Sequence, residues 1–233
     1  MEYKTYCNGM VVEYVFPCPF EGSHVLSGKR PAILIVKDDV LFAVPITIAH
    51  KTKKLPTHIL LPQGIAGLKQ SGLGLAESIL TIQKENVVRV FGNIEPSSEL
   101  WCKVLECVRL QFGIDFVCKV LRQQAPKYNQ GDIVLIDRPC FGSINMILSN
   151  DACNETSPVI TVAPLQVKGN NENNQLVNTQ LSMETVHFYG KLFSSGFLVD
   201  MGGLRTVDKE MIIATVGSCS RKNLLEKLRE FWH

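Results

Sequence analysis

The chain has 233 residues, of which 45% are hydrophobic and 20% are charged. This composition excludes a disordered or collagen-like chain, and the length suits two domains that each bury a core. The formal net charge of +2 is far below that of a protein that holds nucleic acid by charge alone.

The cysteines and the N-terminal sequence indicate the compartment. The 8 cysteines contain no CxxC pair and mostly interrupt apolar runs, which predicts reduced core residues and no structural metal or cofactor. MEYKTYCNGM has no leader-like pattern, and no apolar run is long enough to span a membrane. We therefore expect a cytoplasmic protein that does not enter a membrane.

The elements in chain order repeat once. The matched segments are TIQKENVVRVFG (81–92) with TVDKEMIIATVG (206–217), GMVVEYV (9–15) with GDIVLID (131–137), PAILIV (31–36) with NMILSN (145–150), and FAVPIT (42–47) with TVAPLQ (161–166). Their common order predicts a tandem duplication. We place the first copy at residues 1–122 and the second at 123–233, joined by the linker QQAPKYNQG.

Each copy is predicted to be rich in β-strands and to end in one helix. Short runs of Val, Ile and Leu are separated by Gly, Pro, Asp and Asn, as in successive strands. An amphipathic helix begins after Pro96 in the first copy and after Ser218 or Ser220 in the second. This order predicts a small closed β-barrel with a helix on one side. The polar segment 168–180 is predicted to be an exposed insertion.

Three segments and a final helix carry a family resemblance. GSHVLSGKRPAILIV, FAVPIT and SGLGLAESILTIQKENVVRVFG resemble, in this order, the landmarks of the MazF/PemK family of bacterial toxins. The likeness covers residues 9–113, and the second copy carries the same landmarks over 131–232. The resemblance implies a mainly β (α+β) fold, in which two SH3-like barrels of MazF/PemK (CcdB-like) type, each with a C-terminal helix, form an intramolecular pseudo-dimer. A chain that satisfies its own dimer surface is expected to be a monomer.

The same resemblance implies a function. Family members are endoribonucleases of type II toxin–antitoxin systems, which cut single-stranded RNA through its 2′-OH without a metal or cofactor and are inhibited by a small acidic antitoxin. Such chemistry needs a cation to neutralise the pentavalent phosphorane. Arg30 suits this task because its planar fork holds two phosphate oxygens. The catalytic Arg and Thr of the family carry over to Arg30 and Thr47.

Further residues are predicted to bind the substrate, and they are Ser23, His24, Lys29, Lys51, Glu77 and Ser78. The imidazole of His24 could accept or donate a proton, and the lysines attract backbone phosphates. Glu77 and Ser78 stand where the family commonly has Asp and Gln.

The second copy lacks this chemistry. In the sequence alignment Ile144 replaces Arg30 and Asn145 replaces Pro31, while Gln166 stands in the place of Thr47. At most one copy is therefore predicted to be active. Two other functions stay open: a catalytically inactive tandem barrel that binds nucleic acid or a protein partner, and a toxin that acts on a protein, as the CcdB proteins do.

Overall fold

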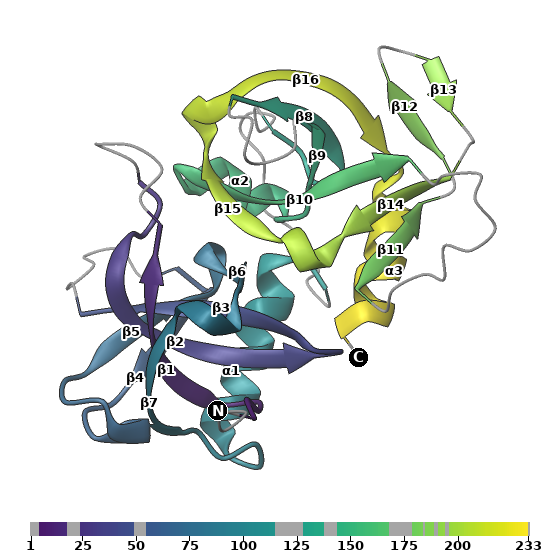
Figure 1. Cartoon of the computed structure of the whole chain (residues 1–233). Helices are drawn as coiled ribbons and strands as arrows, with labels where there is room; N and C mark the ends of the chain where they lie inside the picture. Colours follow the sequence, from purple (N-terminus) through teal and green to yellow (C-terminus); the bar gives the residue numbers. More distant parts are fainter. Residues whose placement is uncertain are drawn as a thin grey trace. The chain divides into compact units, whose positions relative to one another are not determined.

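The computed structural model describes residues 5–17, 24–48, 55–114, 128–137, 144–167, 179–183, 185–188, 191–193 and 196–232. Its contacts divide the chain into two units, Met1–Val108 and Arg109–His233, which follow one another along the colour bar of Figure 1. The predicted boundary between residues 122 and 123 lies outside the described residues.

The first unit is a 7-stranded antiparallel sheet followed by helix α1 (Glu99–Gln111). The strands along the sheet are β4 (His58–Leu61), β5 (Gly72–Leu75), β3 (Val40–Thr47), β2 (Gly28–Lys37), β1 (Met10–Phe16) and β7 (Val87–Asn93), with β6 (Leu80–Ile82) paired to β3. Three 3₁₀ turns connect them, namely η1 (Ile65–Gly67), η2 (Ala76–Ser78) and η3 (Lys84–Asn86).

The hairpin of β2 and β3 forms the centre of this sheet. Its two-residue turn consists of Asp38 and Asp39, whose φ angles of 47° and 66° are those of the tight turns that match the twist of paired strands. Both faces of β2 are covered, because Ala32, Ile33 and Leu34 are all 0% exposed. A strand buried on both faces reads as a continuous apolar run, as PAILIV does.

Helix α1 begins where the sequence predicts. The hydroxyl oxygen of Ser98 accepts a hydrogen bond from the backbone N–H of Trp101 at 3.2 Å, which is the geometry of an N-cap. Trp101, Val104 and Val108 are buried at helical spacing and form the face that packs on the core.

The second unit is a 9-stranded antiparallel sheet that ends in helix α3 (Arg221–Trp232). Its strands along the sheet are β11 (Gln180–Met183), β14 (Phe197–Asp200), β10 (Val159–Val167), β9 (Ile144–Ile147), β8 (Asp132–Ile136), β16 (Ile212–Cys219), β12 (Val186–Phe188) and β13 (Lys191–Phe193), with β15 (Arg205–Asp208) paired to β10. Its other short elements are α2 (Asp151–Thr156), η5 (Met201–Gly203) and η6 (Lys209–Met211).

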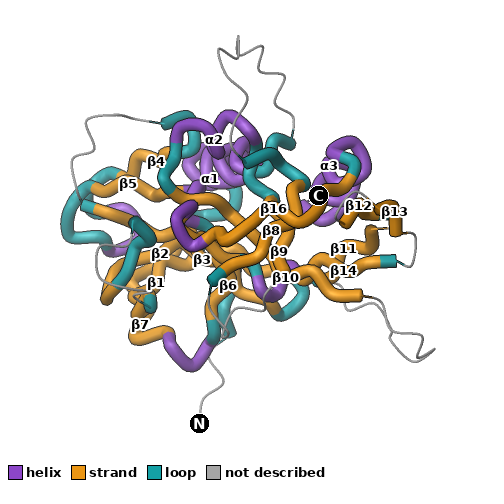
Figure 2. The backbone as a smooth tube through the Cα atoms, turned by 90° about the horizontal axis from the view of Figure 1, so that it is seen from above, coloured by secondary structure: helices purple, strands orange, loops and turns teal. Residues whose placement is uncertain are grey.

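The fold is mainly β with a few helices, as Figure 2 shows, and its paired strands are antiparallel. The predicted closed barrels are not found. Among the described residues one sheet runs as an open path from β4 to β7, and the other runs from β11 to β13. The turns η3 and η6 explain this difference. Each turn redirects the chain after a short strand, so the strands before and after it pair with different partners. In the first unit β6 pairs with β3 and β7 with β1. In the second unit β15 pairs with β10 and β16 with β8.

A buried polar cluster in the second unit holds the residues that follow Val108. The side-chain amide of Gln130 donates to the carbonyl oxygens of Phe112 at 2.7 Å and Leu148 at 2.8 Å. The ring of Phe112 stacks on Trp232 with their centroids 5.3 Å apart, and the backbone N–H of Asn150 donates to the carbonyl of Gln111 at 2.9 Å. The last turn of α1 is thus part of the second unit's core.

No helix in the described part of the chain is long and apolar enough to cross a membrane.

Candidate functional site

Arg30 lies near the start of β2, just before the buried residues of that strand. Its Nε and Nη2 atoms donate to the carbonyl oxygen of Ser27 at 2.9 and 2.5 Å, so the guanidinium folds back over the turn before the strand. Partial burial lowers the pKa of Arg30, although a guanidinium stays charged in proteins. Arg30 is therefore a half-buried cation held in a fixed position.

Thr47 lies at the end of β3 and is 8% exposed. The recorded pairing of β2 with β3 ends at Ala32 and Pro45, and both strands continue two residues further, to Arg30 and Thr47. Side chains two residues apart on a strand share a face. The structure thus brings Arg30 and Thr47 to the same end and the same face of the sheet, and their catalytic roles stay predictions.

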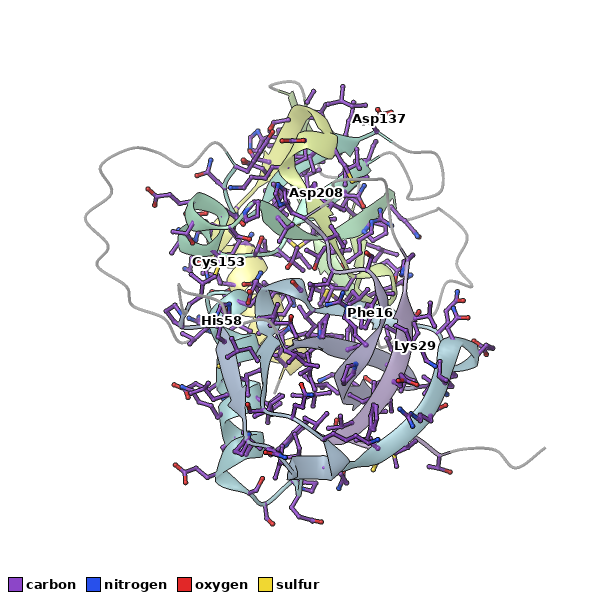
Figure 3. The ribbon with its side chains drawn as sticks, turned by 90° about the vertical axis from the view of Figure 1, so that its left-hand side faces the viewer. Phe16, Lys29, His58, Asp137, Cys153 and Asp208 are labelled. Atoms are coloured by element: carbon purple, nitrogen blue, oxygen red, sulfur yellow. The ribbon has the colours of Figure 1, made fainter. Side chains whose placement is uncertain are left out.

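Lys29 and Arg89 share one carboxylate. The Nζ of Lys29 lies 3.2 Å from Oε2 of Glu13, and the Nε of Arg89 lies 3.1 Å from the same oxygen. Desolvation acts to raise the pKa of Glu13, but the hydrogen bonds and charges of the two cations outweigh it and lower that pKa. Lys29, which Figure 3 labels near Phe16 at the end of the paired strands β1 and β2, remains largely exposed.

Glu77 and Ser78 lie in η2 and are buried. The carboxylate of Glu77 accepts hydrogen bonds at 2.9 Å from the hydroxyl of Thr57 and from Nε2 of His58. The Nδ1 of His58 accepts from the backbone N–H of Leu55 at 3.1 Å, so Nε2 carries the ring proton. Desolvation acts to raise the pKa of Glu77, yet the bonds from His58 and Thr57 lower it overall.

Sequence reasoning did not find this cluster of Thr57, His58 and Glu77. His58, labelled in Figure 3, is the first residue of β4 and is 8% exposed. No local pattern marks a histidine whose partner lies 19 residues further along the chain. Of the remaining predicted site residues, His24 is exposed, while Ser23 and Lys51 lie outside the described residues.

A pocket of about 260 Å³ lies in the first unit, beside the point where the pairing of β2 and β3 ends. It is lined by Pro31, Ile46, Ile48, Leu68, Lys69, Gln70, Gly72, Arg89 and Phe91. The guanidinium of Arg89 lies 4.6 Å from the ring centre of Phe91. The pocket is thus apolar inside and carries cations at its rim. Sequence reasoning missed it because its residues come from four separate segments.

The strand pairing corrects the alignment of the two copies by one residue. The backbone N–H of Gly9 donates to Leu34, and the N–H of Gly131 donates in the same way to Ile147. Because Leu34 matches Ile147, the residue that matches Arg30 is Ser143 and not Ile144. Ser143 lies outside the described residues, and it carries no charge.

The same correction matches Asn145 with the buried Ala32. Asn145 is 0% exposed, and its side-chain oxygen accepts a hydrogen bond from Arg205. Gln166, which matches Thr47, is exposed. The second unit therefore has neither the cation nor the hydroxyl of the first at these places.

Metal and thiol chemistry find little support in the described residues. No group of three His, Cys, Asp or Glu side chains in the part of the chain that the structure describes could hold a metal ion. Burial raises the pKa of Cys107 to about 11 and that of Cys219 to about 12. These two thiols are protonated at neutral pH and are poor nucleophiles.

Comparisons with known proteins give few matches. No family model matches the chain, and no curated protein matches it significantly. Among solved structures, the chain is similar to a mycobacterial endoribonuclease in complex with its cognate antitoxin, with 15% identity, a TM-score of 0.37, and coverage of 48% of this chain and 99% of that one. It is also similar to the Mycobacterium tuberculosis toxin MazF-mt6, with 15% identity, a TM-score of 0.35, and coverage of 45% and 99%. At these TM-scores we draw no conclusion about activity from the similarity.

Proposed function

We propose that the protein is a MazF/PemK-like endoribonuclease toxin that cleaves single-stranded RNA without a metal and has one active half. The observation that carries this proposal is the position of Arg30 and Thr47 at the same end and face of the first unit's sheet. The order of the family landmarks, found twice in the chain, supports it. The active half is the first copy, residues 1–122.

The proposed reaction uses these groups as follows. The 2′-oxygen of a ribose attacks the adjacent phosphorus and loses its proton to a base, for which His24 is the candidate. The guanidinium of Arg30 neutralises the charge that develops on the phosphorane, and the hydroxyl of Thr47 donates to one of its oxygens. The bond to the 5′-oxygen breaks, and that oxygen takes up a proton. The products are a 2′,3′-cyclic phosphate and a 5′-hydroxyl.

We also propose that the two units arose by duplication and form a pseudo-dimer within a monomeric, cytoplasmic chain. The strands from β4 to β7 follow the same order as those from β11 to β16. The backbone N–H of Ala76 donates to Thr57 just as that of Met201 donates to Thr179. The expected partners are single-stranded RNA and a small acidic antitoxin.

One observation favours the second candidate, an inactive barrel pair that binds nucleic acid or protein. Two donors of Arg30 are directed to the carbonyl of Ser27, and the carboxylate of Glu77 is buried against His58. A site with these groups engaged within the protein could hold a polyanion without cutting it.

Cleavage of RNA in the presence of a chelator tests the proposal. The purified chain, incubated with single-stranded RNA and excess EDTA, should yield fragments that end in a cyclic phosphate. If the protein binds the RNA but does not cut it, the nuclease proposal is wrong and the binding function is supported.

A further inference from the structure

A glycine in the lining of the first unit's pocket matches a buried phenylalanine in the second unit. Because Ala76 and Met201 make the same hydrogen bond at the end of β5 and β14, counting back along each strand matches Gly72 with Phe197. Gly72 lines the pocket, whereas Phe197 is 3% exposed and packs against the ring of Phe188. The second unit thus places an aromatic ring of its own where the first has only a hydrogen atom.

The charges at this place also differ between the units. Arg89 at the pocket rim matches Ala214 in the repeated segment. Arg89 is held by Glu13 at 3.1 Å and lies over Phe91, so little of its side-chain freedom remains to be lost on binding. Lys69 adds a second cation to the lining. The first unit thus combines an apolar pocket with two cations, whereas the second unit has Phe197 and Ala214 at two of the matching positions.

The pocket adjoins the proposed catalytic pair. Pro31 in its lining directly follows Arg30, and Ile46 and Ile48 lie on either side of Thr47. Alternate residues of a strand point to opposite faces, so the pocket and the pair use opposite faces of the same strand ends. The pocket residues Pro31, Ile46 and Ile48 are therefore direct chain neighbours of the pair.

We propose that this pocket holds one unpaired base of the RNA whose phosphate Arg30 and Thr47 bind. This inference rests on the proposed function. A nucleotide consists of a flat base and an anionic phosphate. The base resembles the ring that Phe197 places at the matching position of the second unit, and the phosphate is attracted by the cations of the first unit's pocket. The side-chain amide of Gln70 offers both a donor and an acceptor to the edge of a base. A single-stranded ligand presents such bases without the cost of unpairing them.

The test is the binding of short single-stranded 2′-O-methyl oligoribonucleotides, which cannot be cleaved through the 2′-oxygen. Removing the base at one position after another should weaken binding by about ten-fold at one position. Ile48→Trp, which fills the pocket mouth, should weaken binding of the intact oligonucleotide by a similar factor and abolish the effect of the missing base. The matched control is Leu60→Trp, because Leu60 is 61% exposed, as against 58% for Ile48, and lies outside the pocket lining. Thermal melting checks that both variants are folded.

Three results would overturn the inference. In the first, no oligonucleotide binds, or every missing base has the same effect. In the second, Ile48→Trp binds as tightly as Leu60→Trp. In the third, a peptide of acidic and aromatic residues is blocked by Ile48→Trp while oligonucleotide binding is unchanged, which would assign the pocket to a protein partner.

The outcome is separable from that of the nuclease proposal. If one missing base weakens binding but unmodified RNA is not cut, the base pocket is supported and the nuclease proposal is wrong. If RNA is cut but no single missing base weakens binding, the nuclease proposal is supported and the base pocket is wrong.

Discussion

The strand β5 of the first unit begins with Gly72 beside an open pocket, whereas β14 of the second begins with the buried ring of Phe197. The difference is reversed at the buried carboxylate, because Glu77 in η2 matches Gly202 in η5, and His58 matches Gln180. The strand order is shared by both units. The comparison teaches that a shared strand order constrains few side chains, so the two units place different groups at matching positions.

The glycines Gly92 and Gly217 show what the frame does constrain. A Cβ on Gly217 would lie 2.1 Å from the carbonyl oxygen of His187, and one on Gly92 would lie 2.8 Å from the backbone of Ala66. In each unit, a segment between matching strands packs against this glycine. It is η1 in the first unit and β12, which pairs with β16, in the second. The glycine that closes both repeats is thus explained by close backbone contact.

The largest expected effect separates the two units by activity. Arg30→Ala should lower the rate of RNA cleavage by about 100-fold or more, because a preorganised donor to the transition state is lost. Gln166→Ala, at the place that matches Thr47 in the second unit, should leave the rate unchanged. Single-turnover cleavage of one labelled RNA measures both. Equal losses in the two variants would mean that the units contribute alike.

A smaller effect tests the close backbone packing at the two matching glycines. Gly217→Ala should lower the free energy of unfolding by about 3 kcal/mol and Gly92→Ala by about 1–2 kcal/mol, since overpacking against backbone has few ways to relax. Trp101 reports on the first unit and Trp232 on the second, so urea titrations followed by fluorescence should show each loss in its own unit. Ser218→Ala is the neighbouring control, and a loss of similar size there would contradict the packing explanation.

The buried carboxylate tests a feature of the first unit alone. Glu77→Gln should lower the stability of this unit by about 1–3 kcal/mol at neutral pH, because an amide cannot accept both hydrogen bonds. The pKa of Glu77 is lowered in the folded chain. Its stabilisation is therefore complete above the unfolded pKa and is lost as the pH falls through the folded value.

Urea midpoints as a function of pH, read from Trp101 in a Trp232→Phe background, measure this effect. The acid-induced loss should be smaller in Glu77→Gln than in the parent. Glu85→Gln, at an exposed carboxylate in η3, is the control. An unchanged acid dependence in Glu77→Gln would show that other carboxylates set it.

The smallest effect concerns the cations around Glu13. Lys29→Ala should leave the urea midpoint of the first unit unchanged within error, because Glu13 keeps Arg89 and exposed ion pairs contribute little. The same variant should weaken oligonucleotide binding and reduce its salt dependence if Lys29 contacts a phosphate. Unchanged salt dependence would remove Lys29 from the substrate-binding residues.

Much of the fold was predictable from local patterns, and the reasons for the failures are physical. The strand at PAILIV and the N-terminus of α1 at Ser98 follow from an apolar run and a capping residue. The register of the second copy was predicted one residue out of place. Strands buried on both faces lack the alternation of polar and apolar residues that fixes register, so NMILSN fits PAILIV almost equally well in either position.

The candidate site was less predictable than the fold. Arg30 and Thr47 were found from the resemblance, but the partner of Glu77 was not, because His58 reaches it only through the pairing of β4 with β5. Gly72 lines the pocket, and a Cβ there would lie 2.8 Å from Cγ2 of Ile46. A glycine in a sequence does not reveal whether its space is filled by neighbours or left open.

The polar contacts around Gln130 determine whether the two units can be produced as separate chains. Helix α1 is continuous through Val108, yet its final residues hydrogen-bond and stack within the second unit. A gene split early in this helix would remove most of the terminal helix from the first product, whereas a split at its end would remove from the second product the carbonyl groups that bind Asn150. No point of division within this helix leaves both products with all of their native contacts.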